Sequence, residues 1–293
     1  MATKSQWFAG ARPRTLPAAI APVLVGTAIA SFEHGANYQI AACALLVSLA
    51  LQVGVNYSND YSDGIRGTDK VRVGPVRLVG QELAAPAKVK RAAYLSFAIA
   101  AVAGLGMTLL SGLWVLIPVG VSAIIAAWFY TGGKHPYGYA GLGEFFVFVY
   151  FGLVAVIGTS ASQSGKISTL SILGGISCGL LSTAILLANN VRDIPSDIDA
   201  GKRTLAVRIG DQNTRTLYQV TVLLGIWLAA VMSAKSSGPN LAWIAIGATF
   251  IAIEPIKVIR SGAGGRDLIP VLAGTGRTLL VYSLLLSFAI LNS

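Results

Sequence analysis

Nine apolar segments, each about as long as a bilayer-crossing helix, follow one another through the 293-residue chain. A helix needs about 20 mostly apolar residues to cross the hydrocarbon core of a membrane. Only 12% of the residues are charged, roughly half of the share found in soluble domains. The sequence therefore predicts an all-α polytopic membrane protein, with one transmembrane domain over residues 1–293. The predicted spans are 15–33, 38–57, 92–110, 113–130, 142–160, 168–188, 215–234, 240–259 and 270–291.

Basic residues lie almost entirely on one side of these predicted spans. The net charge is +10, and all but three of the 22 Lys and Arg residues fall on the side of the N-terminus; the exceptions are Lys166, Lys235 and Arg277. Cytoplasmic loops are enriched in Lys and Arg. We therefore expect a multi-pass protein of the cell membrane with a cytoplasmic N-terminus. The basic excess indicates topology and does not indicate a nucleic-acid partner.

Two polar motifs stand at the inner ends of the second and sixth predicted spans. The first, NYSNDYSDG, covers residues 56–64. If the helix continues through it, Asn56, Asp60 and Asp63 are spaced i, i+4 and i+7, so they share one helical face. Asp69 follows a few residues later, and Glu144 and Glu254 lie near the ends of other spans.

The second motif, LANNVRDIPSDIDAGKRTL, repeats this geometry. Asn189, Asp193 and Asp197 are spaced i, i+4 and i+8, with Asn190 as an alternative neighbour of Asp193. Pro195 removes a helix hydrogen bond, so the sequence places Asp197 less securely. The motifs are four spans apart, and a four-span internal repeat would bring them face to face.

Facing carboxylates repel each other unless a cation lies between them. Oxygen ligands without His or Cys favour Mg²⁺, which also takes water and phosphate oxygens. Nearby basic side chains would neutralise the charge of a departing diphosphate. These bases are Arg66, Lys70, Arg72, Arg77, Lys134, Lys202 and Arg203. The alternative is that all these charges are solvated loop residues at a membrane interface.

The two motifs resemble the aspartate-rich motifs of the UbiA superfamily of intramembrane prenyltransferases. The nine predicted spans and the Tyr130-x-x-x-Lys134 pattern agree with that resemblance, which covers nearly the whole chain. Three stretches are similar to the branch that prenylates 1,4-dihydroxy-2-naphthoate in menaquinone synthesis. They are ARPRTLPAAIAPVLVG, RVGPVRLV and NNVRDI followed by AGKRTLAVRIG.

The resemblance implies nine helices around a central cavity capped by cytoplasmic loops, with Mg²⁺ as cofactor. It implies that polyprenyl diphosphate ionises to an allylic cation, which the naphthoate ring attacks at its carboxyl-bearing carbon before CO₂ is lost. The implied catalytic residues are Asp60, Asp63, Asp193, Asp197 and Lys134, with Asn56, Asp60 and Asp63 holding one ion and Asp193 and Asp197 the other. The implied substrate-binding residues are Asn56, Asn189, Asn190, Arg66, Asp69, Arg72, Arg77, Tyr130, Lys202 and Arg203.

The first motif departs from the wider superfamily pattern, which places an acid where this chain has Gly64. Asp63 or Asp69 is expected to take that role. Candidates for contact with the aromatic ring are Tyr57, Tyr61, Tyr130, Tyr137, Tyr139 and Arg14, although aromatic residues at a membrane interface are commonly anchors.

Two other functions fit parts of the pattern. The same chemistry on another acceptor, such as 4-hydroxybenzoate, homogentisate, a haem vinyl group or a chlorophyll precursor, would use the same motifs. A transporter with intramembrane carboxylates would place acids near mid-span. The acids here gather at the inner ends of spans, which favours the enzyme.

Overall fold

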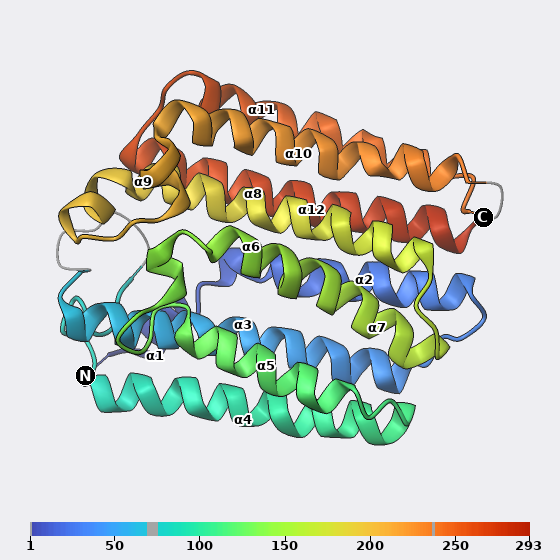
Figure 1. Cartoon of the computed structure of the whole chain (residues 1–293), viewed down its shortest axis with the longest axis horizontal. Coiled ribbons are helices and arrows are strands. Elements are labelled where there is room, and N and C mark those ends of the chain that lie inside the picture. Colours follow the sequence, from blue (N-terminus) through green and yellow to red (C-terminus); the bar gives the residue numbers. More distant parts are fainter. Residues whose placement is uncertain (1, 69–75, 236–237) are drawn as a thin grey trace.

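Long helices run back and forth along one axis and make up the body of the protein (Figure 1). The computed structural model describes residues 2–68, 76–235 and 238–293, and within these ranges the regular elements are all helices. Asp69, Lys70 and Arg72 lie outside the described residues. The helices are α1 (Lys4–Gly10), α2 (Pro17–Phe32), α3 (Tyr38–Arg66), α4 (Pro86–Ser111), α5 (Leu116–Phe129), α6 (Gly143–Val147), α7 (Ala155–Ser164), α8 (Thr169–Asp199), α9 (Leu205–Ile209), α10 (Asp211–Ser233), α11 (Thr249–Arg260) and α12 (Ile269–Leu291).

Shorter helical pieces join or extend these elements. The stretch η3 (Phe148–Val154) is π-helical and makes α6 and α7 one continuous span. The remaining pieces are 3₁₀ turns: η1 (Pro13–Thr15), η2 (Tyr137–Ala140), η4 (Ala242–Ala248) and η5 (Gly265–Leu268).

Seven of the described helices are long and apolar enough to cross a membrane, or eight if the bent pair Lys4–Thr15 and Pro17–Phe32 is one span. The chain is therefore a multi-pass membrane protein. The remaining predicted span, 113–130, corresponds to α5, which has only 14 residues. At 1.5 Å per residue α5 is about 21 Å long, shorter than the hydrocarbon core. The difference arises because the chain turns through residues 113–115 before the helix begins.

Both polar motifs lie at the ends of unbroken helices. The Asn37 side chain caps α3, whose last residue, Arg66, is followed by Gly67 in a left-handed conformation (φ 74°). The helix therefore continues through the first motif, which is the condition under which Asn56, Asp60 and Asp63 share one face. Helix α8 likewise continues through Pro195 to Asp199. Asp193 and Asp197 therefore lie one turn apart on the same helix.

The chain ends lie at opposite ends of the bundle (Figure 1). Helices α1 and α9 lie at the N-terminal end, together with the C-terminal ends of α3 and α8. This end therefore collects both polar motifs, as the proposed four-span repeat requires.

Close helix packing fixes the position of α8. Gly152 in the π-helical stretch faces Gly175 and Gly179 of α8, and a Cβ at Gly152 would lie 2.5 Å from the Gly175 carbonyl oxygen. Small residues permit this approach of backbones in membrane helices. On its other side α8 packs against α10, while α3 packs against α4 and α2 against α12.

Candidate active site

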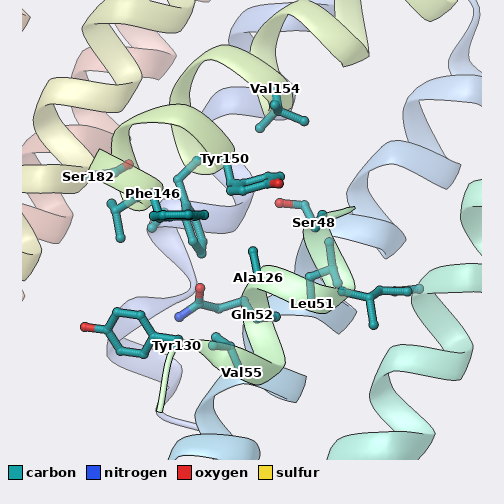
Figure 2. A pocket seen from close by; sticks show the side chains of 18 of the residues that line it. Ser48, Leu51, Gln52, Val55, Ala126, Tyr130, Phe146, Tyr150, Val154 and Ser182 are labelled. Atoms are coloured by element: carbon teal, nitrogen blue, oxygen red, sulfur yellow. The ribbon is translucent and has the colours of Figure 1, made fainter. Parts of the chain in front are cut away.

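A cavity of about 490 Å³ opens between helices α2 to α8. Figure 2 shows Gln52 and Leu51 of α3 facing Phe146 and Tyr150 across this space. Residues along α4, α5 and α7 make one part of the wall apolar, namely Ala100, Gly104, Leu105, Met107, Ile117, Val121 and Gly158. Polar residues line the end where α3 and α8 carry their motifs. The cavity therefore has a charged mouth and an apolar body.

Lys202 joins the two acidic motifs at this mouth. Its Nζ lies 3.4 Å from Asp63 Oδ1 and 4.0 Å from Asp197 Oδ1. All three side chains are at least 95% buried, and all three residues line the cavity. The inner ends of α3 and α8 are therefore close enough for one cation to bridge their carboxylates.

Tyr139 completes this cluster from the loop after α5. Its hydroxyl donates a 2.5 Å hydrogen bond to Asp63 Oδ1, and Lys202 Nζ lies 4.5 Å from the centroid of its ring. Burial, and next the negative charge of Asp63, raise the pKa of Tyr139 well above its ordinary value. The phenol is therefore a neutral donor at physiological pH.

Asp60 and Asp193 lie behind the cavity wall. The Asp60 carboxylate accepts hydrogen bonds from the backbone amides of Leu78 (2.7 Å) and Val79 (3.0 Å). Asp193 accepts two 2.7 Å bonds from the guanidinium of Arg192. Neither acid is among the residues that line the cavity. Asp60 thereby ties the segment after the first motif to α3.

Asn56 holds the N-terminal turn against α3. It lines the cavity and donates from Nδ2 to Ala11 O (2.9 Å) and Thr15 Oγ1 (3.2 Å). This turn contains Arg12, a cavity-lining residue with a left-handed backbone (φ 55°). In the sequence, Arg12 is one of the basic residues that indicate topology. The feature of the sequence that could have singled it out is its position directly before Pro13, in the stretch ARPRTLP.

The other predicted polar residues divide into two groups. Four of them line the cavity: Arg77, Tyr130, Asn189 and Asn190. Three are exposed and do not line it: Lys134, Arg66 and Arg203. Arg66 donates to the carbonyls of Thr131 and Gly133, which ties α3 to the loop after α5.

The six residues considered for contact with the aromatic ring also fall into two groups. Tyr130, Tyr137 and Tyr139 line the cavity. Tyr57 donates to the Trp7 carbonyl at 2.9 Å, Tyr61 stacks on Trp128, and Arg14 is exposed. One wall near the mouth is thus aromatic, because Tyr137 also stacks on Phe146 with centroids 4.0 Å apart.

Comparison with known proteins identifies the family. The model of the UbiA prenyltransferase family matches residues 19–264. The chain belongs to the UbiA prenyltransferase family. It is 50% identical to 1,4-dihydroxy-2-naphthoate octaprenyltransferase of Mycobacterium tuberculosis over 99% of this chain and 98% of the relative. It is 48% identical to the enzyme of that name from Mycobacterium leprae, over 99% and 97%.

A UbiA homologue from Archaeoglobus fulgidus, solved with GPP and Mg²⁺, has the same fold. Its TM-score is 0.69 at 15% identity, and the match covers 98% of this chain and all of the other. From its family and its close relatives the chain is a prenyltransferase, and helices α2 to α8 line its cavity.

Proposed function

We propose that this prenyltransferase transfers a polyprenyl group from polyprenyl diphosphate to 1,4-dihydroxy-2-naphthoate, with loss of CO₂ and diphosphate. The product is demethylmenaquinol. The observation that carries the proposal is the near-full-length similarity to enzymes of that name, at 50% identity. The single transmembrane domain over residues 1–293 supplies the site.

The residues present fit a magnesium ion that is shared with substrate phosphates. Within the described residues, no group of three or more His, Cys, Asp or Glu side chains could hold a metal. Asp63 and Asp197 nevertheless lie on either side of the Lys202 ammonium, so a cation already occupies the space between them. Two carboxylates suit Mg²⁺, which keeps several waters and takes phosphate oxygens as further ligands.

Asp63 and Asp197 would hold the ion, with Asn56 as a further oxygen ligand from α3. When bound, Mg²⁺ neutralises negative charge on the diphosphate and favours its departure. Lys202 and Arg77 line the same space and place positive charge against the leaving group. Tyr139 keeps Asp63 oriented through its hydrogen bond.

The apolar body of the cavity receives the prenyl chain and protects its reactive end. Allylic cations react with water, so the apolar residues of α4, α5 and α7 keep water away while the acceptor ring attacks. The ring enters on the aromatic wall formed by Tyr130, Tyr137 and Phe146. Rearomatisation follows when the carboxyl group leaves as CO₂.

The positions of the chain ends bear on the number of membrane crossings. Their location at opposite ends of the bundle requires an odd number of crossings. We infer nine crossings, counting α5 and the bent N-terminal pair, with the charged mouth facing the cytoplasm of a cell membrane. The concentration of Lys and Arg at that end supports this orientation.

Turnover with Mg²⁺, a polyprenyl diphosphate and 1,4-dihydroxy-2-naphthoate labelled in its carboxyl carbon tests the function directly. We expect released labelled CO₂ that depends on both Mg²⁺ and the diphosphate. Prenylation of 4-hydroxybenzoate without naphthoate turnover would refute the acceptor while keeping the reaction class. The absence of prenyl transfer to either acceptor would refute the proposal as a whole.

A further inference from the structure

One buried carboxyl group beside the cavity has no role in the chemistry described above. Glu144 lies in the first turn of α6 and is 7% exposed. Its Oε1 accepts a 2.8 Å hydrogen bond from Asn190 Nδ2 of α8. Within the described residues, nothing forms a hydrogen bond with Glu144 Oε2. A carboxyl group between apolar helices is costly, and such residues in membrane proteins mark functional sites by default.

Asn190 connects Glu144 to the cavity. It lines the cavity on α8, one turn beyond Leu186. Because its amide nitrogen donates to Glu144, its Oδ1 is the atom left to accept a hydrogen bond. None of the described residues donates to that oxygen. The oxygen keeps accessible surface, and Asn190 is one of the residues that line the cavity.

The surroundings of Asn190 suit a flat aromatic molecule. Tyr130 packs against Gly143, next to Glu144, where a Cβ would lie 3.2 Å from Tyr130 Cε2 and 3.3 Å from Leu186 Cδ2. Tyr130 contacts Tyr137 edge to face, with centroids 5.5 Å apart. The amide oxygen of Asn190 is thus a hydrogen-bond acceptor beside an aromatic wall.

We propose that Asn190, held in one orientation by Glu144, is the anchor for a hydroxyl group of the aromatic acceptor. The phenolic O–H donates to Asn190 Oδ1, and Glu144 is the positioning residue that keeps the amide oxygen turned to the cavity. This inference rests on the proposed function, because it requires a phenolic acceptor.

Steady-state kinetics of the purified full chain in detergent test the anchor. We expect Glu144→Leu and Asn190→Ala each to raise KM for 1,4-dihydroxy-2-naphthoate about tenfold, the value of one lost hydrogen bond. KM for the polyprenyl diphosphate should change less than about twofold. The double variant should be no worse than either single one, because the two residues act as one unit.

Discrimination between acceptors separates an anchor from a packing role. The wild type should bind the dihydroxy acid more tightly than inhibitory analogues that lack one or the other hydroxyl group. Glu144→Leu and Asn190→Ala should both bind at least one of these analogues as tightly as the dihydroxy acid. Glu144→Gln, whose amide oxygen still accepts from Asn190, should keep most of the wild-type preference for the dihydroxy acid. Thr183→Val is the matched control, because Thr183 Oγ1 donates to the backbone oxygen of Glu144 (3.4 Å) and not to its carboxyl group, and Thr183 does not line the cavity.

Several results would overturn the anchor. These are equal increases in both KM values, additive losses in the double variant, or unchanged discrimination in Asn190→Ala. If Glu144→Leu does not fold, Glu144→Gln and Asn190→Ala still decide the matter. A failure of the proposed function is distinguishable, because it already shows in the turnover assay of the wild type. If the wild type uses a different phenol, the same KM comparison is made with that phenol, and an enzyme that uses no phenol refutes the anchor too.

Discussion

Lys202 Nζ lies 3.4 Å from Asp63 Oδ1, although the two residues are 139 positions apart in the chain. This ion pair closes the charged mouth of the cavity, with Asp197 on the far side of the same ammonium group. The electrostatic balance of the mouth therefore depends on a few buried groups.

Replacing Asp63 by Asn should lower turnover by at least about 100-fold while the thermal midpoint changes little. The substitution keeps the shape of the side chain but removes the charge that the cation and Lys202 require. Asp211→Asn is the control, because Asp211 is a half-exposed acid paired with Arg215 away from the cavity. Full activity in Asp63→Asn would contradict the proposed site.

Replacing Asp60 by Asn should lower stability as well as activity. Asp60 accepts hydrogen bonds from two backbone amides, and an Asn side chain offers one oxygen for them and turns an N–H group towards the other. One buried amide is then left without an acceptor, which costs about 1–3 kcal/mol. Thermal unfolding in detergent should show a drop of several degrees that Asp63→Asn lacks. Equal midpoints in the two variants would refute this division of roles.

Chelation of divalent ions should abolish turnover, and Mg²⁺ should restore it better than Ca²⁺. The two cavity-facing carboxylates supply hard oxygen ligands, and the small ion suits a site completed by water and phosphate. Titration of EDTA-treated enzyme with each ion measures this. Undiminished turnover in excess EDTA would argue against a metal between Asp63 and Asp197.

Tyr139→Phe should reduce kcat/KM for the polyprenyl diphosphate about tenfold without moving the pH profile between pH 6 and 9, since it removes one charge-assisted hydrogen bond. Burial, and then the charge of Asp63, raise the pKa of Tyr139. A raised folded-state pKa means that its stabilising effect is complete below the unfolded value of about 10 and is lost only above it. Plots of rate against pH for the wild type and Tyr139→Phe should therefore be parallel between pH 6 and 9. An alkaline limb that disappears in Tyr139→Phe would contradict a neutral donor.

Cysteine labelling in intact cells should place the two ends of α5 on opposite sides of the membrane. In a chain without Cys43 and Cys178, Ser111→Cys should react with an impermeant maleimide from outside. His135→Cys should react only after the membrane is opened. Labelling of both positions from the same side would exclude α5 as a crossing and with it the nine-span topology.

The sequence predicted the helical class, because apolar runs are a local signal. It predicted a shared face for Asn56, Asp60 and Asp63 on the condition that the helix continues past residue 57, and α3 meets that condition. The roles of Leu78 and Val79 were not visible, because backbone amides leave no trace in a residue pattern. The length of α5 was overestimated, since the turn at residues 113–115 is as apolar as the helix.

Glu144 shows another reason for incomplete prediction. It stands within an apolar segment near a span end, and only the packing of α6 on α8 reveals that it meets Asn190. Arg12 was hidden differently, because a basic residue beside the first span is accounted for by topology alone. Its place on the cavity wall follows from the hydrogen bonds of Asn56 to the N-terminal turn.

The π-helical stretch Phe148–Val154 has a consequence for how relatives of this chain can diverge. A π turn holds one residue more than an α turn, so deleting one residue there would restore an ordinary helix. Because the extra residue is taken up within that wide turn, the side chains on both sides would keep their facing, and only those within Phe148–Val154 would point in new directions. The part of the wall that carries Tyr150 and Val154 (Figure 2) would then present different side chains to the cavity, with both helix ends left in place. A single-codon deletion thus reshapes one part of the cavity wall in one evolutionary step.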